Sequence, residues 1–190
     1  MKIEPKVTIQ NAVASARFEH RIELKKIVKA FPEVEYRPET FPGLVFRVNN
    51  PKAAILIFET GRMVCTGAKS VRDVRKAIHK AVGELTEASI IIASRPRIEI
   101  QNIVASVDLG NVAIDLDRTV HMAYGLGSRV IYEPDQFPGA IYYMQDPQVV
   151  FLIFATGKLV CAGARREEDI YRAVEKLLAL LDENDLLIKA

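Results

Sequence analysis

Residues 41–68 read FPGLVFRVNNPKAAILIFETGRMVCTGA, and residues 137–164 read FPGAIYYMQDPQVVFLIFATGKLVCAGA. Compared from residues 36 and 132 onward, the two copies are identical at 15 of 33 positions without a gap. A second pair, VTIQNAVAS at 7–15 and IEIQNIVAS at 98–106, is identical at 6 of 9 positions. One unit is therefore written twice. We expect a first repeat over residues 1–95 and a second over residues 96–190, with the two halves packed together.

The composition is that of an ordinary soluble globular protein, with 49% hydrophobic and 26% charged residues. The sequence has no long apolar run and no signal-peptide pattern, so we expect no membrane partner and an intracellular location. The net charge of +2 hides an asymmetry. Residues 1–95 hold 17 Lys and Arg against 10 Asp and Glu, a charge of +7, and residues 96–190 hold 9 against 14, a charge of −5. Such an asymmetry is typical of proteins with a nucleic-acid or membrane partner, but it is not the uniform basic stripe of a protein that DNA phosphates hold in the main.

Each copy predicts a strand, a helix, several meander strands and a second helix. In the first copy we predict strands over 7–17, 44–48, 53–58 and 62–66, and helices over 24–31 and from Ser70, as N-cap, to about Leu85. In the second copy residues 115–124 predict the first helix, and the last helix follows the stripe from Ile170 to Leu181. We expect residues 181–190 to fray.

The predicted strand over 53–58 is apolar on both faces, because Ile55 and Ile57 alternate with Leu56 and Phe58. Residues 151–154 repeat the pattern. The predicted helices suffice to cover one face of such a sheet, so the other face needs another cover. The two cysteines, Cys65 and Cys161, occupy the same repeat position on the opposite side from the neighbouring valines, which indicates small buried residues rather than a disulfide pair.

These residues together resemble the TATA-box-binding protein family in its short archaeal form. The resemblance covers about residues 7–181 and rests on duplicated Q-N-x-V-A-S, F-P-G, L-I-F-x-T-G-[RK] and C-[TA]-G-A-[KR] blocks. It implies an α+β fold with pseudo-two-fold symmetry: one curved antiparallel sheet of about ten strands, shaped as a continuous saddle, with four helices on the convex face. The resemblance also implies a general transcription initiation factor that binds the minor groove of the TATA box, kinks the DNA and nucleates the preinitiation complex. In the family this kink is about 80°.

By position, the resemblance implies roles for four groups of residues. The wedges that enter between base steps are Phe41, Phe58, Phe137 and Phe154. The polar groups that meet minor-groove acceptors are Asn11, Asn102 and Thr66, and the apolar floor is Val13, Val104, Leu56, Leu152, Val64 and Val160. The residues at or beside phosphate-contacting positions are Arg47, Arg62, Lys69, Lys158 and Arg165. The segment that receives a transcription factor B-like partner, and with it the RNA polymerase complex, contains Glu133, Asp135 and Gln136.

Two departures from the repeat fall in the second copy, which has Ala162 where the first has Thr66 and Tyr143 where the first has Arg47. They remove one hydroxyl and one cation. Together with the charge asymmetry, they lead to the hypothesis that the first half carries more of the salt-dependent DNA binding. The acidic second half would then be free to face protein.

Other readings remain open at this point. On its own a strand phenylalanine is more often a core residue than a wedge. The chain could be the related saddle domain of base-excision enzymes, although no catalytic Lys or Asp beside a helix hairpin is visible. The apolar face could also serve self-association, including a homodimer without DNA, or bind a small molecule, although no converging polar groups are visible. The sequence shows no catalytic or metal-binding pattern. His20, His79 and His121 share no repeat position, and none has a metal-ligand partner at the usual spacing. We therefore expect no enzymatic activity, no metal and no cofactor, in a cytoplasmic protein associated with the nucleoid.

Overall fold

The chain divides into two units that are each described by themselves, in a computed structural model that describes residues 2–92 and 95–189. The first-repeat unit comprises Gln10–Gln101. The second-repeat unit comprises the residues from Asn102 onward together with those up to Ile9. The long strands β1 (Lys6–Arg17) and β6 (Arg97–Asp108) therefore each contribute to both units.

Over the described residues there are four α-helices and a sheet of ten strands in the order β2-β3-β4-β5-β1-β6-β11-β10-β9-β8. Counted outward from the central strands β1 and β6, the first repeat has the order β5-β4-β3-β2 and the second repeat has the equivalent order β11-β10-β9-β8. Strands joined by hairpins pair antiparallel. An antiparallel sheet can be covered by helices on one face only, and this is possible in each half. The predicted α+β class, with four helices and about ten sheet strands, is confirmed.

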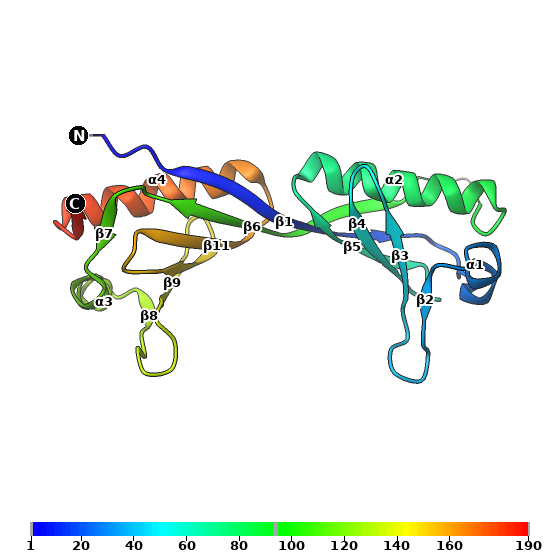
Figure 1. The fold of residues 1–190 in the computed structure, drawn as a ribbon, viewed down its shortest axis with the longest axis horizontal. Helices are drawn as coiled ribbons and strands as arrows, with labels where there is room; N and C mark the ends of the chain where they lie inside the picture. The colour runs from blue at the N-terminus through cyan, green and yellow to red at the C-terminus, as the bar shows by residue number, and fades with distance from the viewer. Residues whose placement is uncertain (1, 93–94, 190) are drawn as a thin grey trace. The chain divides into compact units, whose positions relative to one another are not determined.

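In the first-repeat unit the helix α2 (Val71–Glu87) packs on the strands β3 (Leu44–Val48), β4 (Ala53–Ile57) and β5 (Arg62–Ala68) (Figure 1). The predicted N-cap is confirmed, since Ser70 Oγ accepts a hydrogen bond from the backbone N–H of Asp73 at 3.0 Å. The apolar residues at helical spacing along α2 are all buried: Val74, Ile78, Ala81, Val82 and Leu85. The shorter helix α1 (Leu24–Ala30) and the two-residue strand β2 (Glu35–Tyr36) complete the unit.

In the second-repeat unit the helix α4 (Glu167–Glu183) packs on β11 (Lys158–Ala164), and α3 (Leu116–Gly125) packs on β8 (Arg129–Ile131) (Figure 1). The strands β9 (Ala140–Met144) and β10 (Val149–Ile153) form a hairpin between β8 and β11. Asp115 caps α3 by accepting from the backbone N–H of Arg118 at 3.1 Å. An aspartate is well placed there because the helix dipole is positive at its N-terminus.

The expectation that residues 181–190 fray is wrong for the described part, which excludes Ala190. The helix α4 continues to Glu183, and β12 (Leu187–Lys189) then pairs antiparallel with β7 (Val112–Ile114) in a separate two-stranded sheet. Leu186, just before β12, is only 1% exposed. Its burial anchors the chain end, and two strands of three residues carry too little periodicity for the sequence to predict them.

Candidate nucleic-acid interface

The face of the first-repeat sheet that lies away from α2 carries half-exposed apolar side chains. In β5, Val64 and Thr66 are half-buried, while Met63 and Cys65 have no exposed surface. Leu56 of β4 lies directly opposite Val64 in the register. Because successive strand residues point to opposite faces, the expected two-sided pattern is confirmed: one set forms the core under α2, and the other is uncovered. The uncovered set extends to Val13 of β1.

The second-repeat sheet has the same arrangement. Val160 of β11 and Leu152 of β10 lie opposite each other and are half-buried, and Cys161 beside Val160 has no exposed surface. Val104 of β6 lies on the same uncovered face. All six residues expected to form an apolar floor are therefore accessible, three in each unit. We call these two surfaces the open faces.

Two pairs of phenylalanines stand at equivalent places in the two units. Phe41 and Phe58 pack edge to face with ring centroids 5.8 Å apart and planes at 72°. Phe137 and Phe154 do so at 5.7 Å and 72°. The first member of each pair is unusually exposed for phenylalanine, 41% for Phe41 and 38% for Phe137. These rings are therefore accessible surface groups rather than core residues.

The glycine of each F-P-G corner lies against its ring pair. A Cβ added to Gly43 would come within 2.7 Å of Cε1 of Phe41 and 2.9 Å of Cε1 of Phe58. At Gly139 the two equivalent distances to the second pair are 2.9 and 3.0 Å. Real Cβ contacts are not this short, so only glycine lets both rings pack down on the backbone here. The duplicated corner in the sequence is thus a seat for the ring pair.

The two asparagines are held by a shared device, a bulged glycine. The N–H of Gly67, which has φ of 95°, donates to Oδ1 of Asn11 at 2.7 Å, and Gly163 donates to Asn102 at the same distance. The strand register shifts at both places, as in a β-bulge with glycine in a left-handed conformation. The amide oxygen of each asparagine is thereby occupied, which fixes the side chain, and Nδ2 of Asn11 also donates to Oγ1 of Thr66 at 3.2 Å.

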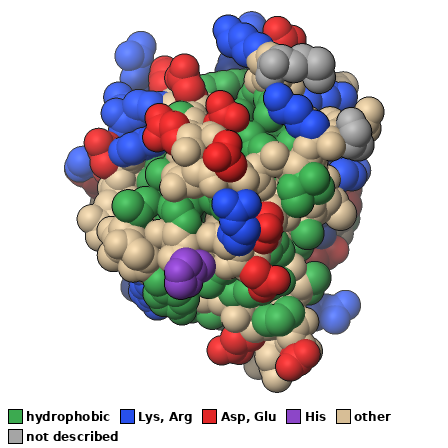
Figure 2. All heavy atoms as spheres, turned by 90° about the vertical axis from the view of Figure 1, so that its left-hand side faces the viewer, with side chains coloured by type: hydrophobic (Ala, Val, Ile, Leu, Met, Phe, Trp, Pro, Cys, Tyr) green, Lys and Arg blue, Asp and Glu red, His purple; other side chains and the backbone are tan. Residues whose placement is uncertain are grey.

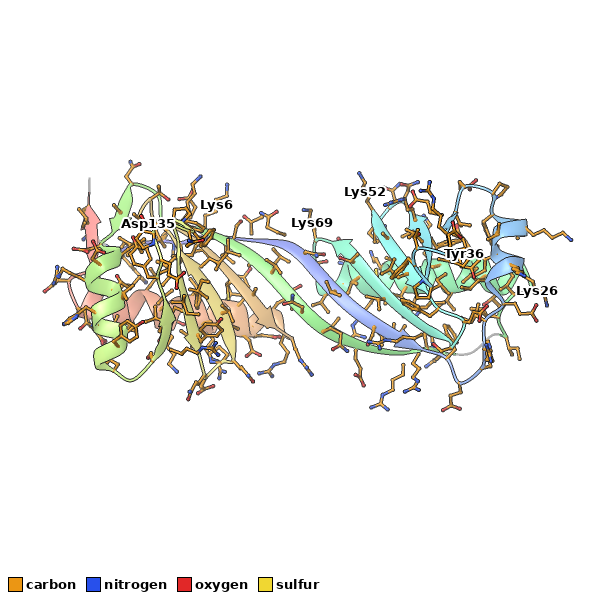
Figure 3. All side chains as sticks on the ribbon, turned by 90° about the horizontal axis from the view of Figure 1, so that it is seen from below. Lys6, Lys26, Tyr36, Lys52, Lys69 and Asp135 are labelled. Atoms are coloured by element: carbon orange, nitrogen blue, oxygen red, sulfur yellow. The ribbon has the colours of Figure 1, made fainter. Side chains whose placement is uncertain are left out.

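The cationic residues expected to meet phosphates are all exposed, but they differ in their partners. Arg47 lies 3.7 Å from Glu35 in a pair whose side chains are 67% and 62% exposed, so the pair is weak and easily replaced. Lys69 (labelled in Figure 3) donates from Nζ to the backbone oxygen of Gln10 at 3.0 Å. The remaining members are Arg62, Lys158 and Arg165.

Sequence reasoning missed one cation in the second-repeat unit. The guanidinium of Arg129 on β8 stacks over the ring of Tyr143 on β9, with Cζ 4.3 Å from the ring centroid. The two residues are directly opposite in the register. Tyr143 occupies the repeat position of Arg47, so a positive charge is present there after all, supplied by the neighbouring strand. Because β8 is only three residues long, the sequence alone did not place Arg129 opposite this tyrosine.

Both repeats match the same family of known proteins. The model of the family described as "Transcription factor TFIID (or TATA-binding protein, TBP)" matches residues 6–88 and again residues 97–184. The chain belongs to this family. It is 48% identical over 176 residues to a protein named TATA-box-binding protein from Pyrodictium occultum, covering 92% of this chain and 86% of that protein. A protein of the same name from Archaeoglobus fulgidus is 46% identical over 173 residues, covering 90% and 92%.

The likeness extends to the fold. The solved structure titled "Methanococcus jannaschii TBP" superposes with a TM-score of 0.82 at 43% identity, covering 94% of this chain and 99% of that one. The resemblance seen in the sequence and the fold class expected from it are therefore confirmed. The TATA-binding protein family is one of transcription factors and not of enzymes.

In this member of the TATA-binding protein family, the loop that contains Glu133, Asp135 and Gln136 is exposed between β8 and β9 (Asp135 is labelled in Figure 3). It closes as a turn, because the N–H groups of Gln136 and Phe137 both donate to the oxygen of Glu133 at 2.9 Å. Figure 2 shows the end of the second-repeat unit where α3 and β7 lie, with acidic and basic side chains interspersed among hydrophobic ones.

The two cysteines of this TATA-binding protein family member are free and buried, as expected. Burial raises the pKa of Cys65 to about 11 and that of Cys161 to about 12, so both thiols are protonated and unreactive at neutral pH. Within the described ranges, no group of three His, Cys, Asp or Glu residues could hold a metal ion. None of the helices in those ranges is long and apolar enough to cross a membrane.

Proposed function

We propose that this protein is a general transcription initiation factor that binds the minor groove of TATA-box DNA, kinks it and nucleates the preinitiation complex. The observation that carries the proposal is the pair of open faces, each apolar, accessible and bordered by an exposed phenylalanine pair. An apolar surface of this extent needs a ligand. Family membership supports DNA as that ligand. The two repeats would then act as one continuous saddle on the duplex, and the protein would reside on the nucleoid.

The phenylalanine pairs act as wedges in this proposal. Phe41 with Phe58, and Phe137 with Phe154, would each enter one base step. Partial unstacking costs only a few kcal/mol per step, which the additional contact with bent DNA offsets. Each pair packs against the glycine of its corner, and this packing restricts both rings and lowers the ordering cost of binding.

The open faces supply the base discrimination. Nδ2 of Asn11 and of Asn102 would donate to adenine N3 or thymine O2, which look alike in A·T and T·A pairs. The apolar floor around Leu56, Val64, Leu152 and Val160 offers no acceptor for the guanine amino group. The selectivity would therefore be for A·T over G·C pairs, with little reading of strand order.

Each half would contribute three cations to phosphate contacts, but the net charges of the two halves differ. The first half would use Arg47, Arg62 and Lys69, and the second Lys158, Arg165 and, in place of the lost arginine, Arg129 stacked on Tyr143. Because the first repeat carries the positive net charge, it would contribute more of the salt dependence.

The decisive experiment compares binding to an A·T-rich TATA duplex and to a G·C-rich duplex of equal length, for the wild type, Phe58→Ala and Phe154→Ala. We expect preference for the TATA duplex and a bend, with both reduced in either variant. Val28→Ala is the control, since Val28 is an exposed apolar residue on α1, outside the open faces. Equal weak binding to both duplexes, unchanged in the variants, would refute the proposal.

The exposed acidic loop of the second repeat is the proposed docking segment for the transcription factor B-like partner, which brings the RNA polymerase complex. Glu133 and Asp135 would meet basic groups of that partner. The first-repeat loop has Arg37 at the place of Glu133, which supports a choice between the two loops by charge. Glu133→Arg should weaken recruitment of the partner to a preformed DNA complex, whereas Glu39→Arg in the first-repeat loop should not.

A second candidate, self-association through the open faces, is favoured by their accessibility in the absence of DNA. A homodimer of this kind would compete with DNA. Sedimentation over a concentration series should show dimers that dissociate when TATA duplex is added. Dimers that persist on DNA would show that self-association uses another surface.

A further inference from the structure

One register pair differs in charge between the two repeats. In the first-repeat unit Arg17 at the end of β1 lies directly opposite Arg62 at the start of β5. In the second-repeat unit the equivalent positions are held by Asp108 of β6 and Lys158 of β11, which also lie directly opposite each other. Opposite charges across a strand pair are stabilising, and like charges directly opposite are destabilising. The first repeat therefore maintains an unfavourable pair where the second repeat has a favourable one.

A third arginine faces the same place. Arg97 on β6 lines a hollow of about 450 Å³ together with Arg17, Arg62 and Thr60. Although Arg97 follows the repeat boundary in the sequence, it belongs to the first-repeat unit in space. A hollow of this size lies in the range of small-ligand sites, about 300–1,000 Å³. We call these four residues the three-arginine site.

The positive charge of the site is only partly neutralised. Arg97 forms an ion pair with Glu99 at 3.2 Å, and Glu99 also lines the hollow. Among the residues that the structure describes, neither Arg17 nor Arg62 pairs with a carboxylate. Three guanidinium groups against one carboxylate leave a surplus of two positive charges beside the hydroxyl of Thr60. The matching hollow of the second repeat, also about 450 Å³, contains Asp108 and Lys158, which cancel.

The site lies on the first-repeat open face, next to a wedge. Arg62 shares its face with Val64 two residues along β5, and Arg17 shares its face with Val13 along β1. Phe58 lies beside Arg62, since the backbone N–H of Phe58 donates to the backbone oxygen of Arg62 at 2.9 Å. A duplex entered by Phe41 and Phe58 would bring its backbone to this edge of the sheet. Guanidinium groups are the side chains best suited to hold phosphate oxygens there.

We propose that Arg17, Arg62 and Arg97, with Thr60, form a binding site for a backbone phosphate of the DNA beside the first-repeat wedge, whereas the second repeat offers at the equivalent place only Lys158 opposite Asp108. The inference rests on the proposed minor-groove function and adds Arg17, Arg97 and Thr60 to the residues that perform it. Bound phosphate relieves the repulsion between Arg17 and Arg62. The like-charge pair lowers the stability of the free protein, and phosphate binding offsets this cost.

The test exchanges the two register pairs. Arg17→Asp gives the first repeat the arrangement of the second, and Asp108→Arg does the reverse. Arg75→Asp on α2 is the control, with the same charge change on an exposed helix residue away from the open face. Binding to the TATA duplex is measured across a KCl series. Each lost phosphate contact lowers the magnitude of the slope of log K against log salt by about 0.9. We expect the magnitude of this slope to decrease by about 1 or more for Arg17→Asp, to increase for Asp108→Arg and to stay unchanged for the control.

Stability of the free protein separates this role from a structural one. Arg17→Asp should raise the melting temperature at low salt, because it replaces repulsion with attraction, while it weakens DNA binding. A residue with only a structural role would move both quantities in the same direction. Arg17→Gln, which removes charge without adding an acid, keeps the test valid if the aspartate variant folds poorly.

A duplex with one neutral methylphosphonate linkage, placed in turn at each position flanking the box, distinguishes backbone phosphate from free anion. At one position the wild type should lose affinity and Arg17→Gln, which retains only Arg62 and Arg97 in the site, should lose clearly less. If wild type prefers TATA DNA but no position behaves in this way, the three-arginine site is refuted while the proposed function stands. Competition by inorganic phosphate alone, without any position effect, would assign the site to free anions and would also overturn the inference. Absence of TATA preference in wild type would instead refute the proposed function.

Discussion

Nδ2 of Asn11 donates to Oγ1 of Thr66 at 3.2 Å, a contact that the second repeat cannot make because Ala162 stands in the place of Thr66. Both asparagines are fixed by their bulged glycines, but only Asn11 has a hydroxyl neighbour on the open face. The two repeats thus share a frame and differ in the polar groups that they present. At such positions one repeat serves as the control for the other.

The first prediction concerns this hydroxyl. Thr66→Val keeps the side-chain shape and removes the hydrogen-bonding oxygen. We expect about fivefold weaker binding to the TATA duplex, since one hydrogen bond contributes about 1 kcal/mol and tenfold corresponds to about 1.4 kcal/mol. Ala162→Thr should strengthen binding by a similar factor. Titration of a labelled duplex measures both, and equal affinities for all three proteins would exclude a direct role for the hydroxyl.

The second prediction concerns the seats of the phenylalanine pairs. Gly43→Ala and Gly139→Ala place a methyl group within 2.7 to 3.0 Å of the ring atoms. The rings are partly exposed and can move aside. We therefore expect the melting temperature to fall by less than it would if the methyl group were added in a buried core. The wedge geometry, however, is lost. Energy transfer between dyes at the duplex ends should show a smaller bend for each variant, and an unchanged bend would mean that the rings do not need this seat.

The third prediction concerns Gly83, in the middle of α2. A Cβ there meets no atom within 4 Å, and the residue is exposed. Gly83→Ala should therefore raise the free energy of unfolding by about 0.5–1 kcal/mol, because alanine loses less backbone freedom on folding. For a chain of this size the melting temperature should rise by about 1–4 °C. DNA binding and bending should not change, which makes this variant a matched glycine-to-alanine control for the two ring seats.

The fourth prediction is a pH dependence that comes from the two buried thiols. Their folded-state pKa values, about 11 for Cys65 and about 12 for Cys161, lie above the ordinary value of 9.0. Since the raised pKa belongs to the folded state, the contribution to stability is complete below pH 9 and is lost as the pH rises through 11 and 12. Each thiol should lower the free energy of unfolding by about 1.4 kcal/mol per pH unit within that window.

Denaturant titrations between pH 8 and 11 measure this slope. The comparison is with the double variant Cys65→Ala, Cys161→Ala, which keeps every other titratable group of the wild type. That variant should be less stable at pH 8 but should show a shallower decline. Parallel declines in the two proteins would mean that the thiols are not the cause. At pH 7 neither cysteine should react with a thiol reagent while the protein is folded.

Much of the site was predictable because strand alternation is local. Once Cys65 is buried, Val64 and Thr66 must lie on the other face, and the repeat transfers the same conclusion to Val160 and Ala162. The cap of α2 is likewise determined by a few adjacent residues, Ser70 to Asp73. Short elements were not predictable, since two or three residues in β2, β7, β8 and β12 give no periodic signal.

The sequence by itself determined the duplication, the two-sided apolar strands and the four phenylalanines, because each is a pattern within a short stretch. The tertiary structure alone decided which residues meet across strands. It placed Arg17 opposite Arg62 and Asp108 opposite Lys158, and it stacked Arg129 on Tyr143. The register between strands is fixed by how the whole sheet packs against its helices, and not by any property of the strands taken singly.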